Sequence, residues 1–263
     1  MSPYKISPLP DEKIEKSLEK YDSFTRTLLI NRGIKNEEEA EKFLNPNYEQ
    51  DSYDPFLILN MDKAVSRILS AIDSGEKIII YGDYDCDGIP GSVILHDFFK
   101  KIEYKNFLNY IPHRHKEGYG LNIPAIDSFA KDGVNLIITV DLAITDVEEV
   151  AHAESLGINV IVTDHHLPQA VLPKAHAVLN SKQIGDNYPD KMLSGAGVAF
   201  KLVQALIKER GKKWGIKEGW EKWLLDMAGL AAIADLVPLQ NENRLIAYYG
   251  LKVLRKSPRI GFQ

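Results

Sequence analysis

The sequence has one cysteine, no excess of positive charge and no hydrophobic run long enough to cross a membrane. The single cysteine, Cys86, excludes an internal disulfide and is consistent with a reducing cytoplasm, where we expect the protein to act. The N-terminus also lacks the apolar core of a secretory signal, so we predict no membrane partner. The net charge is −5 at pH 7, so a phosphate-rich ligand has to be held by local cations or by bound metal.

Internal repeats and low-complexity tracts are absent as well, which excludes a repeat protein. A length of 263 residues and a hydrophobic fraction of 44% suit one large α/β domain with a smaller appendage. Helical spacing at 22–33 and 36–44 predicts a helical N-terminal lead-in over residues 1–59. A further amphipathic helix over 61–74 precedes the first strand.

The most informative stretch follows the apolar strand predicted at Ile78–Tyr81. Asp83, Asp85 and Asp87 occupy alternate positions, so in an extended segment their side chains project to one face. Cys86 then points to the other face, and we expect it to be a small buried residue. Three carboxylates on one face repel one another unless a cation lies among them, which favours a site for a hard metal ion.

Two other interpretations of this stretch have to be weighed. An EF-hand calcium loop also begins Asp-x-Asp-x-Asp-Gly, but it needs a glutamate near position 94 and helices on both sides, and the sequence provides neither. A solvated acidic turn stays open from these residues alone, because acidic turns are common.

Strands and helices alternate through the middle of the chain, which predicts a doubly wound, mainly parallel five-stranded sheet with helices on both faces. After the acidic stretch we predict strands at 107–111, 134–140, 160–163 and 177–180, with helices between them at 91–101, 124–131 and 146–156. Helices at 196–210, 220–234 and 244–256 follow the last strand.

Three of the predicted strands end in polar residues. Besides the aspartates after the first strand, Asp141 follows the strand at 134–140, and the triplet Asp164-His165-His166 follows the strand at 160–163. The carboxyl ends of parallel strands lie along one edge of a sheet, where ligands bind at the point of strand-order reversal. Asp141 alone is typical of a helix N-cap, but three such strand ends together favour a site.

A helix expected near the end of the chain carries two more aspartates. Asp235 lies in a hydrophobic run, where an unpartnered carboxylate costs several kcal/mol, so we expect it to be paired, hydrogen-bonded or on metal. For Asp226, earlier in the same helix, we expect a solvated or capping position.

Taken in order, these segments resemble the DHH phosphoesterase superfamily, named after its Asp-His-His triplet, and within it the bacterial exonucleases specific for single-stranded DNA. The resemblance covers nearly the whole chain, and its segments are 31–33, 43–46, 81–88, 111–122, 139–141, 162–166, 193–202 and 234–239. It implies two divalent ions, Mn²⁺ or Mg²⁺, of which the mixed carboxylate and imidazole ligands suit Mn²⁺ well.

The resemblance also implies a role for each site residue. Asp141 bridges the two ions, Asp85 holds one of them with help from Asp83, and the other is held by a second group, Asp87, His165 and Asp235. His166 faces the scissile phosphate, and Asp164 orients the histidines from behind.

Further residues become candidates for substrate contacts. Arg114, at the end of the second strand, is expected to grip a phosphate. The turn containing Ser194, Gly195 and Gly197 opens a helix, and its amides either bind a phosphate or serve packing alone. For Tyr119 a core position is favoured over stacking on a base.

The chain departs from the family pattern in two places. Ala143 stands where the family usually has glycine, so the geometry of that turn is open. The family also continues into a second domain, whereas this chain stops at Gln263, so we expect residues 60–240 to form the DHH domain and residues 241–263 to begin a connection to a domain outside this chain.

The expected function is two-metal hydrolysis of single-stranded DNA from the 5′ end, in DNA repair and recombination, with a single-strand-binding protein and a helicase as further partners. A DHH enzyme acting on short oligonucleotides or cyclic dinucleotides is one alternative. A non-catalytic replication scaffold built on a decayed DHH domain is another, although every expected metal ligand is present in this sequence.

Overall fold

The structure, a computed structural model, describes residues 11–262. The chain divides into two compact units, Met1–Ser52 and Tyr53–Gln263. The division falls after Ser52, whereas the expected lead-in continued to residue 59. The short helix η1 (Pro55–Leu57) belongs to the second unit because it packs against α9 (Gly195–Arg210).

The described part of the first unit is helical, as predicted. Its helices are α1 (Glu12–Ser17), α2 (Ser23–Ile30), α3 (Glu37–Leu44) and α4 (Tyr48–Asp51). The side chain of Asn36 accepts a hydrogen bond from the Glu39 amide at 2.9 Å and so caps α3. The unit has its own small core, which consists of Leu18, Leu29, Ile34 and Ala40.

The second unit contains the predicted parallel sheet, and this confirms the fold class. Its strands are β1 (Lys77–Gly82), β2 (Phe107–Tyr110), β3 (Val134–Val140), β4 (Asn159–Thr163) and β5 (Ala177–Leu179), in the order β2-β1-β3-β4-β5. Each neighbouring pair of strands is parallel. The strand order reverses between β1 and β3, which is where such sheets bind ligands.

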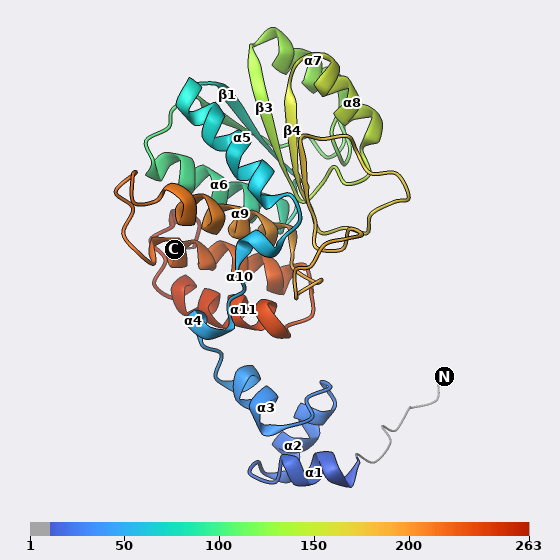
Figure 1. Cartoon of the computed structure of the whole chain (residues 1–263), viewed down its shortest axis with the longest axis vertical. Coiled ribbons are helices and arrows are strands. Elements are labelled where there is room, and N and C mark those ends of the chain that lie inside the picture. The colour runs from blue at the N-terminus through green and yellow to red at the C-terminus, as the bar shows by residue number, and fades with distance from the viewer. Residues whose placement is uncertain (1–10, 263) are drawn as a thin grey trace. The chain divides into compact units, whose positions relative to one another are not determined.

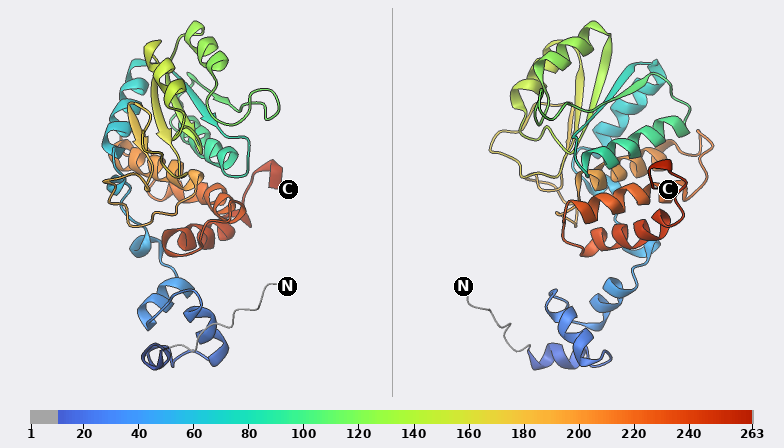
Figure 2. Two further views of the ribbon diagram at one scale, coloured as in Figure 1. Left: turned by 90° about the vertical axis from the view of Figure 1, so that its right-hand side faces the viewer. Right: turned by 180° about the vertical axis from the view of Figure 1, so that it is seen from behind.

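Helices cover both faces of this sheet (Figures 1 and 2). One face packs against α5 (Met61–Ser74), α6 (Gly88–Lys101) and α9, and the other packs against α7 (Ile123–Lys131) and α8 (Val147–Ser155). Because both faces are covered, the central strands are buried over most of their length, apart from residues near their N-terminal ends, and are rich in hydrophobic residues. Loops therefore supply the polar groups, at the carboxyl edge of the sheet.

Two further helices, α10 (Leu225–Ala234) and α11 (Asn241–Leu254), pack closely against each other in the second unit. A Cβ atom at Gly229 would lie 2.8 Å from the Cα of Gly250, so only glycine permits this approach. The helix predicted at 220–234 begins as a 3₁₀ turn, η2 (Trp220–Leu224), and a last 3₁₀ turn, η3, spans Ile260–Phe262. Among residues 11–262, no helix combines the length and hydrophobicity needed to cross a membrane.

The expectation for Asp226 was wrong. Its carboxylate is buried and pairs with the Arg259 guanidinium, at 2.8 Å from Oδ2 to Nε and 3.2 Å from Oδ1 to Nη2. The two residues lie 33 positions apart, so local sequence gave no indication of the pair. The pair fastens the chain after α11 to the start of α10.

Candidate metal centre

The acidic stretch after β1 is a tight turn and not the extended segment that we predicted. The side-chain oxygen Oδ1 of Asp85 accepts hydrogen bonds from the amides of Asp87 (2.8 Å) and Gly88 (2.9 Å), which folds the backbone back into α6. A Cβ atom at Gly88 would lie 2.5 Å from the carbonyl oxygen of Asp83, so this turn requires glycine. Cys86 is exposed at the turn, contrary to our expectation. The turn sends the three aspartates into two different groups.

The first group consists of Asp83, Asp85 and Asp141, whose ligand atoms lie within 4.8 Å of one another. Asp83 and Asp141 are almost fully buried, and burial raises the pKa of both carboxyl groups. The Oδ1 atoms of Asp83 and Asp141 have no hydrogen-bond donor. Buried carboxylate oxygens without a donor are costly, and a bound cation removes that cost.

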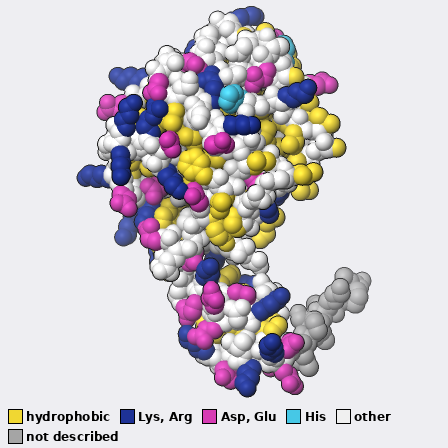
Figure 3. Space-filling view, in the orientation of Figure 1, with side chains coloured by type: hydrophobic (Ala, Val, Ile, Leu, Met, Phe, Trp, Pro, Cys, Tyr) yellow, Lys and Arg dark blue, Asp and Glu magenta, His cyan; other side chains and the backbone are white. Residues whose placement is uncertain are grey.

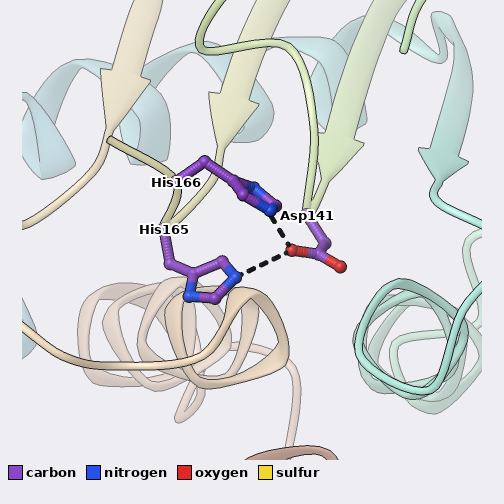
Figure 4. Close-up of side chains that lie close together, drawn as sticks. All are labelled: Asp141, His165 and His166. Carbon is purple, nitrogen blue, oxygen red and sulfur yellow. Dashed lines mark ion pairs between the residues drawn. The ribbon is translucent and has the colours of Figure 1, made fainter. Parts of the chain in front are cut away.

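The second group consists of Asp87, His165 and Asp235. The Nε2 atom of His165 lies 3.6 Å from Asp87 Oδ2, 3.2 Å from Asp141 Oδ1 and 3.6 Å from Asp235 Oδ2. Figure 4 shows the rings of His165 and His166 on the same side of Asp141. Burial and the charge of His166 lower the pKa of His165 to about 4, so its ring is neutral at pH 7.

A neutral imidazole carries one N–H, so it can donate to no more than one of the three surrounding carboxylates. The contact to Asp141 is within ion-pair distance, yet it lacks hydrogen-bond geometry. Several acceptor atoms therefore converge with too few donors between them. This arrangement of nitrogen and oxygen ligands suits Mn²⁺ or Mg²⁺.

The N-terminus of α9 holds Asp87 in place. The amides of Gly195 and Ala196 donate to Asp87 Oδ2 (2.6 Å) and Oδ1 (2.7 Å). Burial raises the pKa of Asp87 to about 7 even though these two bonds favour its charged form. Ser194 is fully buried, and its hydroxyl accepts a hydrogen bond from the Gly197 amide at 3.1 Å. Two amides of this turn therefore bind the Asp87 carboxylate, a role that neither interpretation of the turn, phosphate binding or packing alone, had included.

Gly195 also allows α9 to approach the strand ends closely. A Cβ atom at this position would lie 2.6 Å from the Cβ and 2.8 Å from the Oδ1 of Asp141. Any larger residue at position 195 would therefore overlap Asp141. By contrast, a Cβ atom at Gly197 would meet its neighbours at 3.5 Å or more, which is ordinary contact.

Asp164 lies behind the two histidines and is fully buried. Its Oδ1 accepts from the amides of His165 (2.7 Å) and His166 (3.1 Å) and lies 2.8 Å from His166 Nδ1, while Oδ2 accepts from the Ile144 amide at 2.9 Å. Burial alone would raise the pKa of Asp164, but the bonds to His166 and to the amides hold it below its usual range. The hydrogen bond to Asp164 in turn raises the pKa of His166.

Asp235 is less buried than its hydrophobic sequence context suggested. Its side chain is 28% exposed because α10 ends at this residue and the next, Leu236, turns outward in a left-handed conformation (φ 58°). The carboxylate nevertheless reaches His165, so the end of α10 contributes to the second group.

The turn after β3 has an uncommon backbone. Asp141 (φ 63°) and Ala143 (φ 85°) both adopt left-handed conformations, which cost about 1–2 kcal/mol for a residue with a Cβ atom. The turn therefore forms with alanine at the position where the family usually has glycine. The Thr139 hydroxyl supports it by donating to the Leu142 carbonyl at 3.1 Å.

Two side chains from the loop between β2 and α7 reach the rim of the site. Arg114 is exposed, and its guanidinium lies 4.4 Å from the ring centroid of Tyr84 in the acidic turn. Tyr119 is 48% exposed, so the predicted core position was wrong. Its hydroxyl donates to the Asp141 carbonyl at 3.1 Å and lies 3.3 Å from His166 Nδ1.

Sequence reasoning missed two residues that follow β5. The Asn180 side chain donates to the His166 carbonyl at 2.9 Å, and the Lys182 ammonium donates to the His165 carbonyl. β5 ends at the same edge of the sheet as the other strands, so the polar residues after it should have been included in the site on the same argument.

Comparisons with known proteins identify the family of this chain. The family model described as "DHH family, N-terminal domain" matches residues 77–234. The single-stranded-DNA-specific exonuclease RecJ of Bacillus subtilis is 45% identical over 258 residues, which are 97% of this chain and 31% of that protein.

Solved structures of RecJ are similar to this chain as well. A crystal structure of exonuclease RecJ bound to manganese matches with a TM-score of 0.69 and 31% identity, over 78% of this chain and 50% of that one. The structure of RecJ from Thermus thermophilus in complex with Mn²⁺ matches with a TM-score of 0.74 and 26% identity, over 95% of this chain and 34% of that one. The chain spans about a third of the length of the curated relatives that it matches.

Proposed function

This chain belongs to the DHH family, and on that premise we propose that its two groups of carboxylates and histidines bind two divalent ions, Mn²⁺ or Mg²⁺, and hydrolyse phosphodiester bonds. The observation that carries the proposal is the excess of acceptors: a neutral His165 faces three carboxylates, and buried oxygens of Asp83 and Asp141 have no donor.

The residues divide between two positions. Asp83 and Asp85 would hold one ion, and the second group, Asp87, His165 and Asp235, would hold the other. Asp141 is part of the first group and its Oδ1 lies 3.2 Å from His165 Nε2, so it would contribute to both sites. When bound, two such ions neutralise the charge that develops on a phosphoryl group and lower the pKa of water.

The remaining side chains have tasks of their own. His166 is kept in orientation by Asp164, and its raised pKa favours a protonated ring that can donate to a phosphoryl oxygen. Tyr119 steadies the Asp141 carbonyl, and Arg114, stacked on Tyr84, is placed to bind a phosphate at the rim.

We further propose single-stranded DNA as the substrate, degraded from the 5′ end in repair and recombination, in the cytoplasm. The support is the similarity to proteins named single-stranded-DNA-specific exonuclease RecJ. A single-strand-binding protein and a helicase are the partners that suit such a substrate. Positive and negative side chains are interspersed over the face shown in Figure 3, and the net charge of the chain is −5, so we assign the DNA contacts to local cations such as Arg114.

The relatives do not favour the alternatives. The curated proteins that this chain resembles are named for single-stranded DNA and not for cyclic or very short substrates. A decayed scaffold is also disfavoured, because the candidate ligands from four separate segments meet in space.

The test combines two substrates with Mn²⁺. Bis(p-nitrophenyl) phosphate reports phosphodiester hydrolysis without a need for DNA contacts, and a 3′-labelled single-stranded oligonucleotide reports shortening from the 5′ end. We expect both to be hydrolysed, and we expect Asp87→Asn to abolish both activities while the exposed control Asp62→Asn retains them. Hydrolysis of neither substrate by the wild type would overturn the proposal.

A further inference from the structure

The last residue of β5 and the segment that follows it hold the whole Asp-His-His triplet by its backbone. The Leu179 carbonyl accepts from the Asp164 amide at 3.1 Å, and Asn180 donates to the His166 carbonyl at 2.9 Å. Asn180 Oδ1 in turn accepts from the Lys182 amide at 2.8 Å, which turns the chain so that the Lys182 ammonium reaches the His165 carbonyl. Two side chains from one short segment therefore fix the carbonyls of both histidines.

Asn180 and Lys182 both donate to a histidine carbonyl, but the free energy needed to bury the two side chains differs. Asn180 shows that a neutral amide is enough to hold a histidine carbonyl at this site. Lys182 does it with a half-buried ammonium, and burying a charge is much more expensive than burying an amide. A positive charge at this position therefore has to be stabilised by more than the His165 carbonyl.

That charge lies among the residues of the metal centre. The carboxylates whose charges act on Lys182 are those of Asp164 and Asp235, and the charge of Lys182 acts in return on Asp235 and both histidines. An ammonium has three N–H donors and no acceptor, and the His165 carbonyl uses one of them. The group is thus equipped to bind an additional anion, and it repels a metal ion.

The position along the sheet edge indicates which anion. Metal-centre residues follow β1, β3 and β4, whereas Arg114 follows the edge strand β2 and Lys182 follows the other edge strand, β5. Arg114 lies on Tyr84, in the turn after β1, and Lys182 reaches the His165 carbonyl, after β4, so the cations are separated by two strand spacings, about 10 Å. One phosphate group does not span this distance, so the two cations would meet different phosphates of a chain that crosses the centre.

We propose that Lys182 is a phosphate-positioning residue, which holds the His165 backbone with one N–H and binds a phosphate of the nucleic-acid backbone on the β5 side with another. The inference rests on the proposed function and deepens it. It adds a second phosphate-binding cation to Arg114 and defines a path for the substrate along the edge of the sheet.

The test compares Lys182→Met and Lys182→Arg with Lys174→Met, an exposed lysine on the preceding loop. The probe for binding is a 3′-fluorescein-labelled oligothymidylate with phosphorothioate linkages, measured with Mn²⁺ over a series of salt concentrations. For Lys182→Met we expect the KM for the hydrolysable oligonucleotide, which has ordinary phosphodiester linkages, to rise about tenfold, with a smaller change in kcat. An effect of this size corresponds to the loss of one charge-assisted hydrogen bond.

The salt dependence separates a phosphate contact from a merely structural role. Loss of one phosphate contact to a single strand makes the negative slope of log K against log salt less steep by about 0.7. We expect this loss in Lys182→Met, recovery of the slope in Lys182→Arg, and wild-type behaviour in Lys174→Met. An unchanged slope in Lys182→Met would overturn the proposal and leave Lys182 as a backbone support.

The outcomes also separate this inference from the proposed function. If the wild type hydrolyses bis(p-nitrophenyl) phosphate and the Lys182→Met slope is unchanged, only the role of Lys182 is wrong. If the wild type hydrolyses no phosphodiester at all, the proposed function fails and the role of Lys182 fails with it.

Discussion

Two buried polar clusters in the second unit differ in whether their donors match their acceptors. The first surrounds Glu242, which is almost fully buried. Glu242 Oε1 accepts from the Lys201 ammonium (2.8 Å) and the Tyr53 amide (3.1 Å), and Oε2 accepts from the Tyr188 hydroxyl. Lys201 also donates to the Tyr53 carbonyl at 2.7 Å. In this cluster the positive and negative charges are both supplied by the protein.

The metal centre has the opposite composition. Its buried carboxylates outnumber the donors that face them, and the pKa of Asp87 and of Asp141 is raised as a result of burial and of like charges nearby. The comparison shows how to distinguish a structural cluster from a ligand site. A matched pair such as Lys201 and Glu242 fastens α9 to α11, whereas unmatched carboxylates are explained by a cation that the chain itself does not supply.

Substitution of a central carboxylate should have the largest effect. In Asp141→Asn we expect phosphodiester hydrolysis with Mn²⁺ to fall about 10³-fold or more, because metal ions contribute several kcal/mol to transition-state stabilisation. The metal-free variant should nevertheless be about as stable as the wild type, because burial and the neighbouring carboxylates raise the pKa of Asp141 to about 11, so a neutral amide replaces a protonated carboxyl group. The rate of phosphodiester hydrolysis checks the expected loss of activity, and urea unfolding without metal checks the expected stability. A metal-free variant much less stable than the wild type would contradict the claim of unmatched charge.

The matched cluster should respond in the opposite way. In Lys201→Met we expect the free energy of unfolding to fall by about 3–5 kcal/mol, because Glu242 is left as an uncompensated buried charge. The affinity for Mn²⁺ should be unchanged once the variant is folded. Adding Glu242→Gln should recover part of the loss in urea unfolding. A loss below about 1 kcal/mol would show that the pair is not the structural clamp described.

The pH dependence of the metal-free protein gives a third contrast. A carboxyl group whose pKa is raised on folding binds more protons in the folded state, so it favours folding at low pH and loses this contribution as the pH rises through its folded pKa. With the pKa of Asp87 raised to about 7, we expect the metal-free protein to lose about 3 kcal/mol between pH 5 and pH 8 from this group alone. Saturating Mn²⁺ should reverse the trend, and a pH-independent stability without metal would contradict this explanation.

The smallest expected effect concerns the glycine next to Asp141. In Gly195→Ala the new methyl group would overlap Asp141, so we expect a loss of about 1–3 kcal/mol in stability together with weaker Mn²⁺ binding. Gly197→Ala is the matched control two residues away, where the new methyl group meets ordinary contacts and Mn²⁺ binding should be retained. Equal effects of the two substitutions on Mn²⁺ affinity would show that closeness to Asp141 is not what requires Gly195.

The fold followed from the sequence because local and global preferences agree. Buried parallel strands such as Ile78–Tyr81 are apolar on both faces, and turn residues mark where they end. The convergence of Asp141 with the DHH triplet followed from the rule that parallel strands share one carboxyl edge. The short helices α1 and α4 were not predicted, because one or two turns carry too little periodicity.

The errors have a common physical cause, which is competition from specific hydrogen bonds and distant partners. Strand alternation put three aspartates on one face, but the bonds from Asp85 to two following amides fold that segment into a turn. Asp226 was misjudged because its partner, Arg259, is distant in sequence. Tyr119 was misjudged because its hydroxyl binds a backbone atom of the site, and sequence patterns do not record such contacts. Lys182 is different, because it follows β5 and the shared carboxyl edge of the sheet was enough to indicate it.

The most direct test of the central claim is calorimetric titration of Mn²⁺ into the metal-free chain at pH 7.5, for the wild type and for Asp141→Asn. The excess of unmatched carboxylates predicts two ions bound per wild-type chain and a lower stoichiometry or a much lower affinity in the variant. No binding by the folded wild type, or binding that Asp141→Asn leaves unchanged, would contradict the account.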